Sequence, residues 1–325
     1  MILFVSIVLL VIGSEFTIKN SVKISDITGF GKTTIGFVLV GLATSLPELS
    51  VSIFAVVNPA NVGVSLGNVL GSNIVNIALV LGVCILIIVL KRPRYPSFLL
   101  TIAKGEMGNL HFGLFIASII PLTLLYIGYA SRVIGIILLG IFVFYMVQLA
   151  RSNRSKQETA VVQASERSNI RRNIMLAIAG AIVVVATAFF IVDSSSFIAT
   201  SIGIPRVVIG ATIVAFGTSI PEFATGISSA RKGHFDLVLG NIVGSGFVNI
   251  TLILGVALTA SPLTVSITAF SNLAVFSLII NLFLWYFLGS ERISWREGVL
   301  LLALYVVFLV ISFSGGSAIT PVSNG

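Results

Sequence analysis

The chain contains the stretch Gly41-Leu42-Ala43-Thr44-Ser45-Leu46-Pro47-Glu48, and a similar stretch recurs as Phe216-Gly217-Thr218-Ser219-Ile220-Pro221-Glu222. Each stretch places a glutamate and a helix-breaking proline in the middle of an apolar segment. An acidic side chain at the centre of a membrane-spanning helix costs about 2.5–3.5 kcal/mol on insertion scales, so a matched pair requires a compensating partner. A bound cation is the simplest such partner. Of the 11 acidic residues, only Glu48 and Glu222 fall deep inside apolar spans.

The composition indicates a polytopic membrane protein. Hydrophobic residues make up 57% of the 325 residues and charged residues only 9%, which is far from the balance of a water-soluble domain. A helix that crosses a hydrocarbon layer of about 30 Å needs roughly 20 mostly apolar residues. We place ten such spans, near 1–18, 33–57, 62–90, 110–128, 131–150, 173–193, 205–229, 236–260, 266–288 and 294–314.

The basic residues predict how these spans are oriented. If both termini are external, five loops face the cytoplasm, and all of the 19 Lys and Arg residues except Arg132 and Arg206 fall in or beside those loops. This asymmetry is what the positive-inside rule expects. The net charge of +8 therefore reflects membrane orientation, and we expect no nucleic-acid partner.

The polar stretch 151–172 divides the chain into a first five-helix repeat over 1–150 and a second over 173–325. Its composition is typical of a solvated cytoplasmic linker. Because five is odd, the second repeat enters the membrane from the opposite side. The predicted fold class is thus all-α, with ten transmembrane helices arranged as two inverted repeats and with broken helices 2, 3, 7 and 8. Such repeats place substrate sites near the bilayer midplane in secondary transporters.

A second pair of motifs supports the repeat. Gly67-Asn68-Val69-Leu70-Gly71-Ser72-Asn73-Ile74-Val75-Asn76 in the third span matches Gly240-Asn241-Ile242-Val243-Gly244-Ser245-Gly246-Phe247-Val248-Asn249 in the eighth. The Gly-x-x-x-Gly spacing in each motif permits close approach of helix backbones. It also permits a local break in the helix, and ordinary helix packing is the simpler alternative.

The side chains of both motif pairs are oxygen donors. Thr44 and Ser45 share a helical turn with Glu48, as Thr218 and Ser219 do with Glu222, while Ser72 with Asn76 and Ser245 with Asn249 each lie on one face. Each proline should also free the carbonyl four residues earlier. Oxygen donors without thiolate or imidazole suit hard cations such as Ca²⁺. Two carboxylates balance one divalent or two monovalent cations, so competition for shared ligands would couple two fluxes.

At these residues the chain resembles the cation/calcium exchanger superfamily, and most closely the prokaryotic sodium/calcium exchangers. The resemblance covers both motif pairs and the ten-span layout. It implies that Glu48 and Glu222 bind Na⁺ and Ca²⁺ alternately, assisted by the side chains of Thr44, Ser45, Thr218, Ser219, Ser72 and Ser245. It also implies that carbonyls at Gly41 and Ala215 serve Na⁺ and that Asn76 and Asn249 flank the central site.

The resemblance further implies alternating access, in which spans one and six slide against the other eight. Relatives commonly carry Asp at the position of Asn249. Asparagine cannot ionise, so this departure argues against cotransport of potassium. The implied protein is a multi-pass cell-membrane antiporter without a cofactor, an enzymatic step or an obligatory protein partner.

Two alternatives stay open at this point. A Ca²⁺/H⁺ antiporter of the same superfamily would use the same glutamates for protons and Ca²⁺. A passive cation channel would need a continuous pore, which inverted halves around one acid pair do not favour. An intramembrane hydrolase is disfavoured because the spans carry no HExxH motif and their serines have no neighbouring histidine base.

Overall fold

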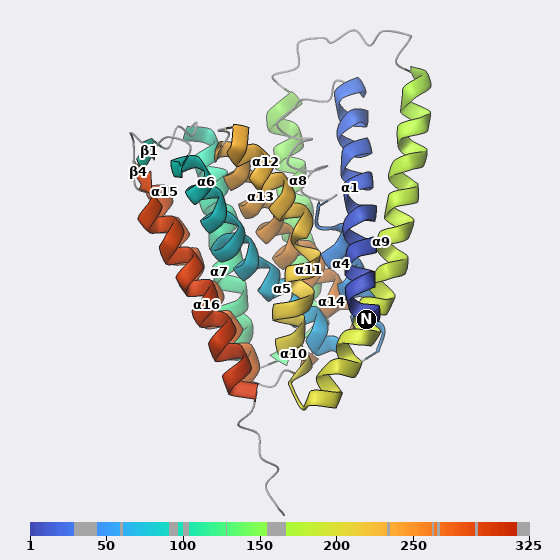
Figure 1. Cartoon of the computed structure of the whole chain (residues 1–325), viewed down its shortest axis with the longest axis vertical. Coiled ribbons are helices and arrows are strands. Elements are labelled where there is room, and N and C mark those ends of the chain that lie inside the picture. Colours follow the sequence, from blue (N-terminus) through green and yellow to red (C-terminus); the bar gives the residue numbers. More distant parts are fainter. Residues whose placement is uncertain are drawn as a thin grey trace, which may run out of the picture.

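The computed structural model describes residues 1–28, 44–58, 61–90, 97–99, 104–127, 129–154, 167–232, 235–261, 263–264, 267–289 and 292–316. Helices account for almost all of them (Figure 1). The uninterrupted long helices are α1 (Ile2–Thr28), α7 (Lys104–Ile127), α8 (Arg132–Arg154), α9 (Arg167–Ile202), α15 (Ile267–Gly289) and α16 (Trp295–Gly316). Even α16, with 22 residues, is about 33 Å long and matches the thickness of a hydrocarbon layer.

The remaining helices are built from shorter pieces. Helix α4 (Leu46–Val57) belongs to the predicted second span. The third span comprises α5 (Val62–Ile74), the π-helical η3 (Val75–Leu81) and α6 (Gly82–Leu90). The seventh comprises α10 (Arg206–Ile209), the π-helical η5 (Gly210–Val214), α11 (Ala215–Thr218) and α12 (Ile220–Lys232). The eighth comprises α13 (Phe235–Val248), the π-helical η6 (Asn249–Ile253) and α14 (Leu254–Ala260).

The predicted breaks are correct for one of these helices and wrong for two. The seventh bends by 47° between Thr218 and Ile220. The third and eighth are not broken. Each runs on through a π-helical segment with a wider turn, which contains Asn76 in the third helix and begins at Asn249 in the eighth. The glycines predicted to allow a break, such as Gly67 and Gly71, stay within regular helix. In the second helix, Ser45 forms a turn between Thr44 and α4, and residues 29–43 lie outside the described part of the chain.

Each predicted span overlaps a described helix, but fewer helices meet the length and composition expected of a membrane span. Within the described residues, five helices are long and apolar enough to cross a membrane, and a sixth joins them if the bent seventh helix is one span. Apolar side chains also face outwards, since Phe4, Phe144, Phe197 and Tyr286 are between 68% and 72% exposed. A hydrocarbon solvent accounts for such a surface, whereas water would not.

Helices α1 and α9 form a distinct pair along one side of the molecule (Figure 1). They run antiparallel and contact each other more extensively than any other two elements. Their backbones cross closely: a Cβ atom on Gly180 would lie 2.6 Å from the carbonyl oxygen of Gly13. The pair joins the rest of the protein through a separate apolar cluster that includes Leu10, Val51 and Ile191.

The other helices share one larger apolar core, in which α5, α6, α13 and α14 lie centrally. Two short antiparallel strand pairs tie loops together at the helix ends. They are β1 (Ser97–Leu99) with β4 (Arg292–Ser294), and β2 (Tyr129–Ala130) with β3 (Leu263–Thr264). The ends of the predicted 151–172 linker are helical, because α8 reaches Arg154 and α9 begins at Arg167.

Candidate cation-binding site

Both glutamates occupy the same place in a helix. Glu48 is the third residue of α4, which follows the turn at Ser45, and Glu222 is the third residue of α12, which follows the turn at Ser219. The backbone angles of the two serines are nearly identical, with φ −86° and ψ 4° at Ser45 and φ −85° and ψ 4° at Ser219. The first backbone hydrogen bond onto each serine carbonyl is 3.0 Å long. The sequence repeat is therefore also a repeat of local structure.

The prolines explain why the helices restart here. Pro47 and Pro221 are each the second residue of the new helix. The backbone N–H has no intrahelical acceptor at this position, so proline, which lacks the N–H, costs no hydrogen bond there. A carboxylate in the first turn interacts favourably with the positive end of the helix dipole. Glu48 and Glu222 are thus placed where the backbone itself favours negative charge.

Hydroxyl groups from the opposite half of the chain contact each carboxylate. The Ser219 hydroxyl donates to Oε1 of Glu48 over 3.3 Å, and the Thr218 hydroxyl also interacts with Glu48. Reciprocally, the Thr44 hydroxyl interacts with Glu222. Glu222 accepts a further hydrogen bond of 3.2 Å from Ser245. Ser45 completes this set, because its Oγ lies 3.2 Å from that of Ser245.

Four buried oxygen atoms at this site have no hydrogen-bond partner. They are Oε2 of Glu48, Oε2 of Glu222, Oδ1 of Asn76 and Oδ1 of Asn249. All four side chains are 0% exposed. Leaving even one polar group buried and unpaired is costly, and a carboxylate more so. All four atoms are acceptors, so the missing partner is a group that attracts oxygen, such as a proton or a hard cation.

The two amides are held by side chains of the neighbouring helices. Asn76 donates from Nδ2 to the Ser245 hydroxyl over 3.4 Å, and Asn249 donates from Nδ2 to Oδ1 of Asn73 over 3.2 Å. Because each amide uses its nitrogen for this contact, its oxygen is left free of protein donors. Asn76 lies within η3 and Asn249 begins η6, so both predicted residues sit where the helix widens.

Asn68 is a site residue that the sequence motif contained but that we did not predict. Its Nδ2 donates to the backbone carbonyl of Glu48 over 3.3 Å, and its Oδ1 accepts a 3.0 Å hydrogen bond from Thr218. It therefore joins the second and seventh helices. The hydroxyl of Ser72 lies 3.5 Å from that of Thr218 and belongs to the same cluster. The repetition of Gly-Asn at 67–68 and 240–241 was the available signal.

The second half uses a different arrangement at this point. Asn241 donates to the hydroxyl of Thr225 over 3.3 Å, and Thr225 in turn donates to the carbonyl of Glu222 over 3.0 Å. The position that corresponds to Thr225 in the first half is Val51, which has no hydroxyl to relay the contact. Asn68 and Asn241 thus reach the equivalent glutamate carbonyls by different routes.

The predicted carbonyl ligands are the least supported members of the set. Gly41 lies outside the described residues. The carbonyl of Ala215 accepts the backbone N–H of Ser219 over 3.0 Å, and Oγ1 of Thr218 lies 3.3 Å from it. Both of its lone pairs therefore have neighbours within the protein.

Close helix packing positions the third and seventh helices. A Cβ atom on Gly67 would lie 2.1 Å from the carbonyl oxygen of Val207, and one on Gly71 would lie 2.4 Å from the Cα atom of Ala211. The first Gly-x-x-x-Gly motif thus acts as predicted. In the second motif the prediction is wrong for Gly240, where an added Cβ would meet nothing within 4 Å.

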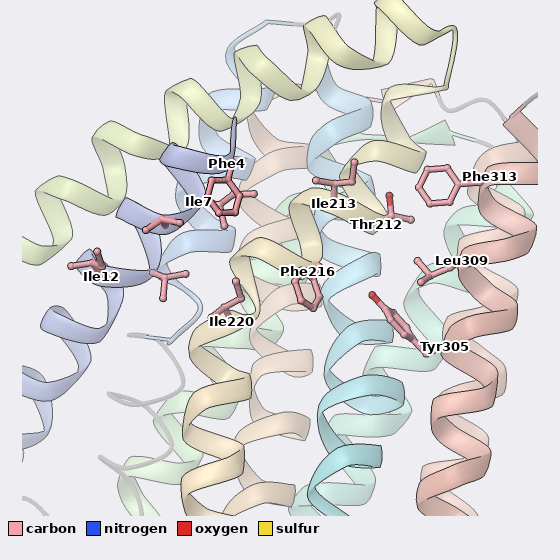
Figure 2. Close-up of a pocket in the computed structure, with 12 residues that line it drawn as sticks. Phe4, Ile7, Ile12, Thr212, Ile213, Phe216, Ile220, Tyr305, Leu309 and Phe313 are labelled. Carbon is pink, nitrogen blue, oxygen red and sulfur yellow. The ribbon is translucent and has the colours of Figure 1, made fainter. Parts of the chain in front are cut away.

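A separate pocket of about 560 Å³ opens between α1, the seventh helix and α16. Figure 2 shows Phe4 and Ile7 of α1 facing Phe216, with Leu309 and Phe313 on the far side. Its lining is almost wholly apolar, and the hydroxyl of Thr212 is already bonded to the carbonyl of Val208 over 2.8 Å. This pocket includes none of the predicted site residues, and none of its lining side chains is charged.

Among the described residues, no three His, Cys, Asp or Glu side chains gather into a metal cluster. The candidate site consists of two carboxylates surrounded by neutral oxygen donors. Comparison with known families identifies the family of the chain. The family model described as "Sodium/calcium exchanger protein" matches residues 1–150 and 172–314. The chain belongs to the sodium/calcium exchanger family. The family comprises membrane transporters rather than enzymes.

Individual relatives agree with this assignment. The sodium/calcium exchanger MaX1 of Methanosarcina acetivorans is 33% identical, with 96% of this chain and 98% of that protein covered. The inner membrane protein YrbG of Escherichia coli is 30% identical over 96% of this chain and 95% of its own length.

Solved structures show the same architecture. A structure of the sodium-calcium exchanger NCX_Mj soaked with Na⁺ and Sr²⁺ superposes with a TM-score of 0.67 at 27% identity, covering 95% of this chain and 96% of the other. The H⁺/Ca²⁺ exchanger CAX gives a TM-score of 0.75 at 17% identity, with 96% and 86% covered. At that identity the second likeness concerns the fold alone.

Proposed function

We propose that this protein is a secondary active antiporter that exchanges Na⁺ for Ca²⁺ across the cell membrane. Both ions would compete for one midplane site built on Glu48 and Glu222. The observation that carries the proposal is the set of four fully buried oxygens without partners, contributed equally by the two halves of the chain.

The donor set suits Ca²⁺. This ion takes six to eight oxygen ligands at about 2.3–2.6 Å and accepts carboxylates, amide oxygens and hydroxyls. Glu48, Glu222, Asn76 and Asn249 supply charged and neutral oxygens, and Thr44, Ser45, Thr218, Ser219, Ser72 and Ser245 supply hydroxyls close by. The carbonyls of Gly41 and Ala215 would be additional ligands for Na⁺.

Charge balance provides the coupling. Two carboxylates neutralise one Ca²⁺ or two Na⁺, and burial makes it costly to leave them without a counter-ion. Entry of one kind of ion therefore favours departure of the other. Named relatives support the choice of ions, since MaX1 is a sodium/calcium exchanger and NCX_Mj was soaked with Na⁺ and Sr²⁺.

The proposed topology has ten spans in two inverted five-helix repeats, with external termini and a cytoplasmic linker. The equal backbone geometry at Ser45 and Ser219 supports the repeat. The antiparallel pair α1 and α9, the proposed first and sixth spans, supports the inversion (Figure 1).

Alternating access would arise from sliding of the α1 and α9 pair against the remaining helices. The two helices contact each other more than they contact any other element, and most of their contacts with the rest are apolar. Hydrogen bonds to the rest are found near the end of α9, where Arg206 donates to Ser196 over 2.7 Å and to Thr200 over 3.1 Å. Apolar contacts lack directional bonds that would have to break during sliding. The close approach of Ile7 to Gly217, where an added Cβ would lie 2.9 Å from Cδ1 of Ile7, brings the pair against the broken seventh helix.

The experiment is Ca²⁺ uptake into proteoliposomes loaded with Na⁺. We expect ⁴⁵Ca²⁺ uptake only when a Na⁺ gradient is present, and we expect Glu48→Gln and Glu222→Gln to abolish it. Glu15→Gln is the matched control because it makes the same chemical change at an exposed position of α1. Uptake that ignores the Na⁺ gradient, or that survives both site substitutions, would reject the proposal.

The same vesicles decide between coupling ions. The CAX likeness shows that one fold accommodates an H⁺/Ca²⁺ exchanger, so fold alone does not identify the coupling ion. Uptake driven by a pH gradient without Na⁺ would establish Ca²⁺/H⁺ exchange. Single-channel currents in planar bilayers would instead establish a passive cation channel.

A further inference from the structure

The two polar motifs differ at one position that faces the site. Gly71-Ser72-Asn73 and Gly244-Ser245-Gly246 correspond residue by residue except that asparagine in the first half is replaced by glycine in the second. Asn73 is 2% exposed and lies directly against its counterpart. A Cβ atom built on Gly246 would be 3.5 Å from Oδ1 of Asn73 and 3.8 Å from its Cγ. An amide on residue 246 would extend beyond that Cβ into the space that Asn73 fills.

The contacts of Asn73 explain what this asymmetry achieves. Its Oδ1 accepts the hydrogen bond from Nδ2 of Asn249, whose own Oδ1 is one of the four unpartnered oxygens. In the other half, Ser245 holds the corresponding Asn76. Ser72, the counterpart of Ser245, contacts Thr218 instead. Asn249 is therefore held by a residue that has no equivalent in the repeat.

We infer that Asn73 is a positioning residue that orients the Asn249 amide so that its oxygen faces the transported cation, and that Gly246 leaves the space for it. The inference rests on the proposed exchange function. It adds a residue that does not itself contact the ion. A buried amide without this acceptor is free to rotate, which presents its N–H₂ group to the cation for part of the time.

The test compares two substitutions of similar size. Asn73→Leu retains the volume over Gly246 but removes the acceptor, whereas Asn73→Gln retains a neutral amide oxygen as acceptor. Partners that orient metal ligands typically contribute 10–100-fold to affinity. We therefore expect Asn73→Leu to raise the KM for Ca²⁺ uptake by at least about tenfold, with a smaller change in the maximal rate. Asn73→Gln should retain most of the affinity. Equal KM values for the two variants would overturn the inference.

A double-mutant cycle separates positioning from general stability. If Asn73 acts through Asn249, adding Asn73→Leu to Asn249→Ala should cause no further loss of affinity, because interacting residues are not additive. Fully additive losses would contradict the inference. Asn281→Ala is the matched control, since Asn281 is 1% exposed in α15 and makes no hydrogen bond to the site; its Ca²⁺ KM should equal that of wild type. If Asn73→Leu does not fold, Asn73→Ala replaces it in the cycle.

The outcomes for this inference and for the proposed function are distinguishable. Wild-type vesicles without gradient-driven Ca²⁺ uptake would refute the exchange function itself. Wild-type transport that depends on Glu48, together with an unchanged KM in the Asn73 variants, would refute only the positioning role.

Discussion

The Ser219 hydroxyl donates a 3.3 Å hydrogen bond to Glu48 although the two residues are 171 positions apart. Each glutamate is thus contacted by the turn that precedes the other glutamate's helix. This exchange of hydrogen bonds means that neither half can form the candidate site alone. It also means that a change in the turn before one glutamate alters the surroundings of the other glutamate.

We expect Ser219→Ala to weaken Ca²⁺ binding by about ten- to a hundredfold. A hydrogen bond to a charged group contributes about 1.5–3 kcal/mol, and each 1.4 kcal/mol changes affinity tenfold. Uptake titrated with Ca²⁺ measures the effect. Ser201→Ala serves as the control, because that exposed hydroxyl bonds only the carbonyl of Phe197 in its own helix. An unchanged KM would show that Ser219 does not assist Glu48.

We expect Gly67→Ala and Gly240→Ala to have opposite effects on stability although the glycines are equivalent in the repeat. An alanine at 67 would place Cβ 2.1 Å from the carbonyl of Val207, and overpacking of this kind costs about 1–3 kcal/mol or more. An alanine at 240 meets nothing within 4 Å and should stabilise the helix by up to about 1 kcal/mol. Thermal unfolding of the purified protein in detergent compares them. Similar unfolding temperatures would contradict the close packing of α5 on the seventh helix.

We expect Asn249→Asp to change the charge carried per Ca²⁺. A third carboxylate in the buried site needs an additional monovalent cation or a proton for neutrality. Parallel measurement of transport current and ⁴⁵Ca²⁺ flux gives the charge ratio, and its variation with pH separates a proton from a metal ion. Asn281→Asp adds an acid elsewhere in the membrane and should leave the ratio unchanged if the variant folds. An identical ratio in wild type and Asn249→Asp would show that residue 249 does not affect the charge carried with each Ca²⁺.

We expect a disulfide between cysteines introduced at Ile7 and Gly217 to stop transport completely. The Cγ atoms of Ile7 lie 3.1 Å from the Cβ position of residue 217, so the pair is within reach of a cross-link that would prevent α1 from sliding along α11. The chain has one cysteine, Cys84, which is first replaced by serine. Reduction should restore transport, and each single cysteine should leave it intact. Full activity of the oxidised double variant would exclude movement at this contact.

The positions of the two glutamates were predictable because the relevant energies are local. Proline lacks an N–H wherever it stands, so Pro47 and Pro221 require a helix to restart next to them. A carboxylate in an apolar segment is costly in any membrane fold, so Glu48 and Glu222 require a partner. The same reasoning was wrong for the third and eighth helices. The glycines there stay within regular helix, and Asn76 and Asn249 lie in π-helical turns that continue the helix.

The sequence by itself determined a helical membrane protein with two equivalent acidic helix starts, since hydropathy, proline and charge act within one segment. Tertiary structure alone decided that Ser219 donates a hydrogen bond to Glu48, that Asn68 joins the second and seventh helices and that Asn73 occupies the space above Gly246. Those contacts depend on distances between segments far apart in the chain. Such distances follow from how closely helices pack, as at Gly67 against Val207. A Gly-x-x-x-Gly pattern indicates that a close approach is possible, but it does not specify the partner helix.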